Sequence, residues 1–310
     1  MMAAQSRPAP TGRSLARVLD ALYERYNDRS YVSPDPLEYI YVFERVEDRE
    51  IAALVASSLA FGSVRQIGGS VRRALAPLGD SPAAFLREVP GPELERTYRG
   101  FKHRWIRGED LARMLGGAGG VLRERGSLGS LFRESLAPGE EDVLPALGRF
   151  VSEIRARTRP FEGCLLPTPV AGSACKRLNL FLRWMVRSDA VDPGGWSDVS
   201  PSLLIVPLDV HMFRICRGLA LTKRRHPGGA AAREVTAAFR RLSPEDPVKY
   251  DFALTRLGIR KNGESADFVR MLGLEDVLGA SKTPDRRRRG STGGDRRRAD
   301  QGGEPCRISR

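Results

Sequence analysis

The first residue with possible chemistry is Asp209, in the stretch SLLIVPLDVHMFRICRGLALTKRR. Residues 203–208 are apolar and partly β-branched, and Pro207 keeps them from forming a helix. After Asp209, apolar residues recur at helical spacing. This pattern predicts that Asp209 is a helix N-cap, with its carboxylate accepting hydrogen bonds from free backbone N–H groups. A carboxylate held rigidly as a cap can still direct its remaining lone pairs into a cleft.

The second residue is Lys176, in the predicted helix SACKRLNLFLRWMVRS. Two stripes at three- and four-residue spacing cover opposite faces: an apolar one of Cys175, Leu178, Phe181, Leu182 and Met185, and a polar one of Lys176, Asn179, Arg183 and Arg187. Lys176 falls in the first turn, where the helix dipole and Arg177 both disfavour a cation and tend to lower the lysine pKa. A surface lysine with no special role is the alternative interpretation.

The elements that must position these residues are almost all predicted helices. Apolar stripes at helical spacing occur around residues 51–59, 67–78, 143–154 and 231–242. A fifth stripe, within 111–122, is weakened by four glycines, and DPVKYDFALTRLG predicts a short helix from Pro247 to Gly258. The fold class is therefore all-α. We expect one helical domain over residues 14–280 with two lobes sharing a cleft, a disordered tail over 1–13 and a disordered Arg-rich tail over 281–310.

The net charge of the chain indicates what kind of molecule it could bind. The 310 residues hold 51 Lys and Arg against 38 Asp and Glu, a net charge of +13. Residues 282–310 hold ten of the basic and four of the acidic residues, so they carry +6 and the rest of the chain +7. The tail could hold polyanions or simply keep the protein soluble. The excess on the folded part predicts attraction to nucleic acid.

Other features point to a simple cytoplasmic protein. The N-terminus lacks the apolar centre of a secretion signal, and no apolar run has the length of a membrane span. The cysteines, Cys164, Cys175, Cys216 and Cys306, lack metal-ligand spacing, and Cys175 and Cys216 are expected to be reduced core residues. His211 is a lone histidine, so no metal and no other cofactor is expected.

Several motifs resemble known families. PLDVHMFRICRGLAL resembles the catalytic segment of helix–hairpin–helix DNA glycosylases of the endonuclease III type, and REIAALVASSLAFGSVRQIGGSVRRAL looks like the early helix pair of that superfamily. More closely, YNDRSYVSPDPLEYIY, GSACKRLNLFLRWMVR and DPVKYDFALTRLGI resemble an uncharacterised, mostly bacterial family of unknown function. That family resembles, distantly, the archaeal 8-oxoguanine DNA glycosylases. The match runs from about Leu22 to Ile259 and implies a glycosylase-like fold.

The resemblance implies roles for both residues. Lys176 becomes the counterpart of the glycosylase nucleophile, and Asp209, 33 residues later, that of the catalytic carboxylate. Lys249 is a rival, but only Lys176 fits the superfamily order of lysine helix before aspartate. Only Gly172 stands where the superfamily has a glycine-rich, phosphate-binding hairpin, and the four-cysteine iron–sulfur loop of endonuclease III is missing.

Such enzymes flip the damaged base into a pocket. The resemblance places Phe61 and Trp184 in the pocket wall and Gln66 in the gap left in the duplex; core positions are the alternative for the aromatic residues. Phosphate contacts are expected from five cations in or near the motifs, Arg177, Arg183, Arg214, Arg217 and Lys249.

The expected function is thus a base-excision glycosylase, with or without lyase activity, that acts as a monomer on damaged or abasic double-stranded DNA. A nucleoid-associated cytoplasmic location goes with it. A non-catalytic nucleic-acid-binding protein of the same fold is the first alternative, and an enzyme of another class using the helical cleft for a small molecule is the second.

Overall fold

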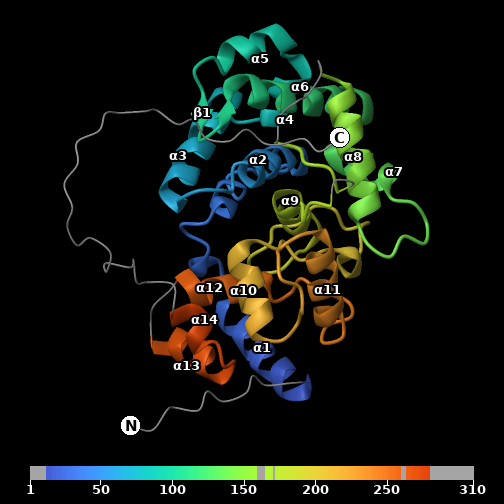
Figure 1. Ribbon diagram of the computed structural model, residues 1–310. Coiled ribbons are helices and arrows are strands. Elements are labelled where there is room, and N and C mark those ends of the chain that lie inside the picture. The colour runs from blue at the N-terminus through green and yellow to red at the C-terminus, as the bar shows by residue number, and fades with distance from the viewer. Residues whose placement is uncertain (1–11, 159–164, 170–171, 260–262, 280–310) are drawn as a thin grey trace, which may run out of the picture.

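The protein is described here by a computed structural model, which covers residues 12–158, 165–169, 172–259 and 263–279. It is mostly helical, as predicted (Figure 1). The α-helices are α1 (Gly12–Tyr26), α2 (Val46–Ser58), α3 (Val64–Leu75), α4 (Pro82–Glu88), α5 (Gly91–Thr97), α6 (Gly108–Arg125), α7 (Leu128–Ser135), α8 (Leu144–Ala156), α9 (Lys176–Val186), α10 (Val210–Gly218), α11 (Gly229–Arg240), α12 (Asp251–Ile259), α13 (Gly263–Met271) and α14 (Glu275–Gly279). Short 3-10 helices are η1 (Arg29–Tyr31), η2 (Pro36–Tyr39), η3 (Ala76–Leu78) and η5 (Pro201–Leu203).

Two short strands complete the described elements. β1 (Lys102–His103) and β2 (Ile106–Arg107) pair antiparallel, with Lys102 opposite Arg107 and His103 opposite Ile106. Arg104 and Trp105 therefore form the turn of a small hairpin between α5 and α6. No helix in the described ranges combines the length and apolar character needed to cross a membrane.

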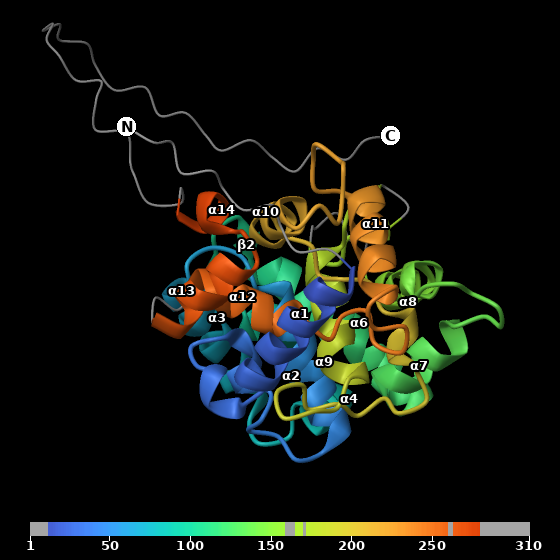
Figure 2. The ribbon, with the colours of Figure 1, turned by 90° about the horizontal axis from the view of Figure 1, so that it is seen from below.

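Helices α2 and α9 pack against each other at the centre of the molecule. In Figure 1, α4, α5 and α6 lie on one side of this pair and α10, α11 and α12 on the other. Figure 2, turned by 90°, shows α1 beside α12 and α13, so the first helix packs against helices near the end of the described chain. Every residue of α9 from Leu178 to Val186 is buried, and so is most of α2.

Two buried carboxylates of α2 hold the ends of other helices. Asp48 Oδ1 accepts a hydrogen bond from Ala83 N of α4 at 2.8 Å. Glu50 accepts from the backbone N–H groups of Leu128 and Gly129 at the start of α7, at 2.7 and 2.8 Å. Negative charge is stabilised at helix N-termini, so α2 fixes both helices through polar contacts as well as apolar ones.

The glycine-containing stripe forms a continuous helix after all. In α6 the glycines permit close packing: a Cβ on Gly117 would lie 2.4 Å from Ile154 O of α8, and one on Gly119 would lie 2.5 Å from Leu86 O of α4. The low helix propensity of glycine is offset here by the approach of the neighbouring backbones.

Two sequence predictions of boundaries need correction. α1 begins at Gly12, inside the segment predicted as a tail, and the rest of that tail and residues 280–310 lie outside the described residues. α12 begins at Asp251 and not at Pro247. Residues 247–250 form turns because Asp246 accepts hydrogen bonds from Val248 N and Lys249 N, which organises them ahead of the helix.

Candidate active site

Lys176 and Asp209 face each other at the N-termini of α9 and α10. Lys176 is the first residue of α9, Asp209 is the N-cap of α10, and Lys176 Nζ lies 3.7 Å from Asp209 Oδ2. The lysine side chain is 27 % exposed and that of the aspartate 43 %. The pair is therefore open to solvent on one side, where a substrate could reach both groups.

Asp209 is positioned by its cap and by the buried segment before it. Asp209 Oδ1 accepts a hydrogen bond from Met212 N at 2.8 Å, which confirms the predicted N-cap. Residues 204–208 are buried without forming a helix, and Val206 N donates to Thr236 Oγ1 of α11 at 3.0 Å. One carboxylate oxygen is thus used by the helix, while the other is turned toward Lys176.

Lys176 is positioned by buried residues at the start of α9. Cys175, the N-cap of α9, has a left-handed backbone with φ of 43° and is buried. Asn179 Nδ2 donates to Ala174 O at 2.9 Å and ties the preceding turn to the helix. The predicted core positions of Cys175 and Cys216 are confirmed, whereas Cys164 and Cys306 lie outside the described residues.

The side chains of Lys176 and Arg177 both reach the end of α2. Lys176 Nζ donates to Ala60 O at 3.4 Å, and an Arg177 guanidinium N–H donates to Ser58 O at 2.8 Å. Carbonyl groups at a helix C-terminus lack partners within the helix and attract cations. These two contacts therefore satisfy the end of α2 as well as placing the lysine beside Asp209.

A buried carboxylate lies close to the pair. Asp251, at the start of α12, interacts electrostatically with both Lys176 and Asp209. Burial raises the pKa of Asp251 above its ordinary value, and the charge of Arg183 opposes that rise. Asp251 Oδ1 has no hydrogen-bond partner among the described residues. Asp251 thus lies within electrostatic range of the pair, while Arg183 balances its charge.

Aromatic residues adjoin the pair through the α2–α3 junction. Phe61 follows Ala60, and the Arg177 guanidinium lies over its ring, 5.2 Å from the centroid. On the hairpin, Trp105 stacks with Phe61 at 4.8 Å between centroids and an interplanar angle of 26°. Sequence reasoning missed Trp105, which is 57 % exposed. The only signal in the sequence was that Trp105 directly follows a cation, Arg104, in GFKHRW.

His103 fixes this junction. Its Nε2 lies 3.0 Å from Phe61 O, a pure acceptor, so Nε2 carries the proton and donates. Nδ1, 2.9 Å from Ser70 Oγ, then accepts from the hydroxyl. Burial lowers the pKa of His103, which favours this neutral form. His103 thus links the hairpin to the α2–α3 junction.

The residues predicted for the base pocket lie in different environments. Phe61 is half-buried beside the pair, and Gln66 is exposed at the start of α3, where it forms a capping box with Ser63. Trp184 does not belong to a pocket wall. Its side chain is fully buried in the core, because α9 is covered on all sides, so the pocket assignment of Trp184 is corrected.

The residues predicted for phosphate contacts also lie in different environments. Arg214 and Arg217 are exposed on α10, and Arg177 lies beside the pair. Lys249 forms an ion pair with Asp20 at 2.8 Å, and its ammonium lies 4.9 Å from the centroid of the Tyr23 ring. A nearby carboxylate thus already neutralises this lysine.

Arg183 cannot contact a phosphate and is corrected. It is 3 % exposed and forms ion pairs with Asp192 and Asp251. Arg187 likewise pairs with Asp192 and Asp246. Arg183 and Arg187, the C-terminal part of the polar stripe, therefore belong to a buried ionic network rather than to a DNA-facing surface.

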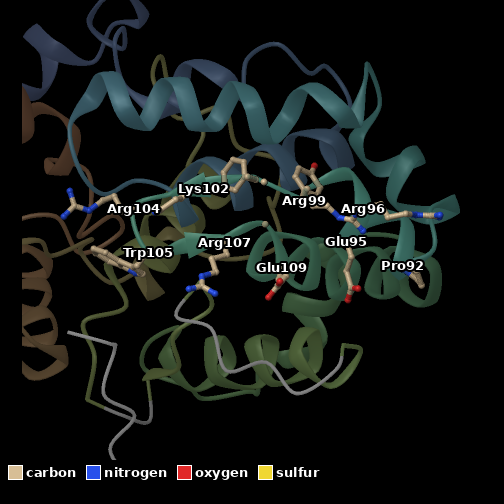
Figure 3. A pocket seen from close by; sticks show the side chains of 13 residues that line it. Pro92, Glu95, Arg96, Arg99, Lys102, Arg104, Trp105, Arg107 and Glu109 are labelled. Carbon is tan, nitrogen blue, oxygen red and sulfur yellow. The ribbon is translucent and has the colours of Figure 1, made fainter. Parts of the chain in front are cut away.

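Two surface hollows adjoin the hairpin. One, of about 280 Å³, is lined by the cations Arg65, Arg73, Lys102 and Arg104, together with Gln66, Gly69, Ser70 and His103. The larger, of about 870 Å³, lies on the other side of the hairpin and is shown in Figure 3. Its lining includes Arg96, Arg99, Lys102, Arg104 and Arg107, with Glu95 and Glu109 as carboxylates. Cations thus surround the hairpin.

Within the described ranges, no group of three or more His, Cys, Asp and Glu residues could hold a metal ion.

Comparison with known proteins gives one match. A search of curated proteins and a search of solved structures found none. A family model described as a protein of unknown function, DUF2400, matches residues 35–260, which is more than half of the chain. The match includes Lys176, Asp209 and the hairpin. The chain therefore belongs to this family of proteins of unknown function, DUF2400.

Proposed function

We propose that this protein is a DNA glycosylase that releases a damaged base, using Lys176 as nucleophile and Asp209 as catalytic carboxylate. The observation that carries the proposal is the 3.7 Å approach of Lys176 Nζ to Asp209 Oδ2 at an open position between two helix N-termini. The resemblance to helix–hairpin–helix glycosylases adds to it, because it identifies the same two residues independently of their distance.

The chemistry requires both groups. The neutral amine of Lys176 attacks the sugar carbon C1′, a bond forms between Nζ and C1′, and the bond to the base breaks with its electron pair leaving on the base. Asp209 is within reach to accept the proton that the lysine must lose, and its negative charge stabilises the cationic sugar. As the sugar ring opens, Asp209 returns this proton to the ring oxygen O4′, the C1′–O4′ bond breaks, and a protonated Schiff base forms, from which lyase cleavage of the strand can follow.

The surroundings of the pair suit nucleic acid. Phe61 offers an aromatic face beside the lysine, and the hairpin next to it is rich in cations. Phosphate groups supply most of the affinity of proteins for DNA, and flipped bases are held by stacking. The same features would be unfavourable for a cationic substrate, because like charges repel.

A second candidate is a non-catalytic DNA-binding protein. It is favoured by the hydrogen bonds that Lys176 and Arg177 make to Ala60 O and Ser58 O, which give both side chains a structural reason to be present. In that case the protein would bind DNA through its cations and leave it unchanged.

Trapping with borohydride decides between them. Borohydride reduces a Schiff base to a permanent protein–DNA cross-link. The wild-type protein is mixed with duplexes that carry 8-oxoguanine, uracil or an abasic site. The proposal expects a covalent band on at least one of them, and its loss in Lys176→Gln.

The matched control is Lys249→Gln, because Lys249 is the rival lysine and is similarly exposed, at 28 % against 27 %. It should keep the band. A band that survives in Lys176→Gln would refute the nucleophile assignment. DNA binding without a band on any duplex would favour the second candidate.

A further inference from the structure

Trp105 occupies the turn of the β1–β2 hairpin and is 57 % exposed. The other two tryptophans of the chain are buried: Trp184 is fully inaccessible and Trp196 is 5 % exposed. Figure 3 shows Trp105 and Arg104 at the end of the hairpin, beside the larger hollow. A tryptophan that exposes so much of its aromatic surface to water is unusual.

The platform behind this indole is rigid. Phe61 stacks on Trp105, and its own carbonyl accepts the hydrogen bond from His103 Nε2. Ser70 of α3 completes the link through His103 Nδ1. A ligand that stacks on Trp105 would therefore meet a surface already held in place, and little side-chain freedom would be lost on binding.

The charged residues that line the smaller hollow beside the platform all have one sign. The smaller hollow is lined by Arg65, Arg73, Lys102 and Arg104, and no carboxylate is among its described lining residues. None of the ion pairs between described residues engages these cations. Arginines elsewhere on the surface do have partners, such as Arg125 with Glu134 and Arg224 with Glu234.

From this arrangement we infer that the hairpin binds single-stranded DNA: an unpaired base stacks on Trp105, and the flanking phosphates lie in the cationic hollows on either side. Stacking on an aromatic side chain and a cationic groove along the backbone are together what binds single strands without sequence preference. The Arg104 guanidinium, 5.2 Å from the indole centroid, is an exposed side chain that the base can displace.

A paired duplex does not offer this contact, since its bases already stack on each other. The inference goes beyond base release, because it concerns how unpaired DNA next to the lysine is held. It rests on the proposed function only for the choice of DNA over RNA. Phe61 connects the two sites, since it contacts both Trp105 and Arg177, the neighbour of Lys176.

The test uses the full-length protein and a labelled oligothymidylate of roughly 10 nucleotides, a length that such sites cover. We expect Trp105→Ala to weaken binding about tenfold at fixed salt, because one stacked base is lost. The slope of log affinity against log salt should stay unchanged. Arg104→Ala should instead reduce that slope by about one unit, because one phosphate contact is lost.

Intrinsic tryptophan fluorescence gives a second measurement of binding at Trp105. The oligonucleotide should quench part of the wild-type tryptophan emission. It should quench none in Trp105→Phe, because the two remaining indoles are buried. Trp105→Phe should keep most of the affinity. Val42→Ala, a change at another exposed apolar residue, is the matched control and should bind as the wild type does.

Three results would overturn the inference: wild-type affinity in Trp105→Ala, equal Trp105 dependence with a fully paired duplex, or tighter binding of the RNA oligomer of the same length. The outcome is separable from that of trapping. Lys176→Gln should bind the single strand normally, and Trp105→Ala should still be trapped at saturating DNA. Failure of trapping alone would leave the hairpin site standing, and loss of the Trp105 effect alone would leave the lysine mechanism standing.

Discussion

Asp209 uses its two oxygens differently. Oδ1 accepts from Met212 N and begins α10, and Oδ2 faces Lys176. The structural role alone would be served equally well by asparagine, which is as good an N-cap as aspartate. The proposed chemical role would not, because an amide carries no negative charge and cannot accept the lysine proton.

Two substitutions separate these roles. Asp209→Asn should keep the cap, with a free energy of unfolding within about 0.5 kcal/mol of wild type, and should slow Schiff-base trapping at least ~100-fold. Asp209→Ala should slow trapping similarly and also destabilise the fold by about 1 kcal/mol. Urea unfolding and single-turnover trapping measure the two effects. Unchanged trapping in Asp209→Asn would remove the aspartate from the mechanism.

The sequence could predict only part of this site. The order of the motifs pointed to Lys176 and Asp209, since each begins a helix that its pattern makes recognisable. It misassigned Arg183 and Trp184, because helical spacing distinguishes the faces of a helix but does not reveal that α9 is covered on every side. The partners that make Arg183 internal, Asp192 and Asp251, follow 9 and 68 residues later.

At the scale of elements, α6 shows how backbone proximity overrides propensity. The four glycines between residues 116 and 120 argue against a helix, yet α4 and α8 approach so closely that a side chain at Gly117 or Gly119 would collide with their carbonyls. The sequence contains the glycines but not the neighbours, so the stripe of Leu111, Met114, Leu115 and Leu122 was the better guide. The same holds for the hairpin, since two-residue strands leave almost no periodic pattern.

Two glycines of α6, Gly116 and Gly119, should respond in opposite ways to alanine. Gly119→Ala should destabilise the protein by roughly 2 kcal/mol, because the new Cβ would lie 2.5 Å from Leu86 O. Gly116→Ala should stabilise it by up to ~1 kcal/mol, because its nearest neighbour, Leu94 Cδ1, lies at 3.7 Å and alanine favours the helix. Thermal and urea unfolding of both variants provide the comparison. Equal effects would mean that the α4–α6 contact is looser than described.

At the scale of the whole molecule, an ionic network joins segments far apart in the chain. Arg183 of α9 and Arg187, directly after its C-terminus, both pair with Asp192. Arg183 also pairs with Asp251, and Arg187 with Asp246, near α12. Tyr23 of α1 donates to Asp189, which pairs with Arg187. The network thus ties α1, α9 and α12 together next to the Lys176–Asp209 pair. Composition alone predicted a basic protein, but not which cations are internal.

Removing one internal partner should be costly. Asp192→Asn should lower the free energy of unfolding by about 3–5 kcal/mol, because two buried guanidinium groups lose their shared carboxylate. Asp198→Asn is the matched control: Asp198 also pairs with an arginine, Arg133, at 3.3 Å, but both side chains are more than half exposed. It should change stability by no more than about 0.5 kcal/mol. Similar losses in both variants would contradict an internal network.

The hydrogen bonds from Lys176 and Arg177 to the end of α2 bear on how related chains are compared. Because Lys176 completes α2 and Asp209 begins α10, folding alone gives a reason to retain both residues, even in a descendant that had lost all activity. Their presence in a relative therefore does not identify an enzyme. A more informative position is one whose side chain is largely exposed, and the indole at the tip of the hairpin is such a position.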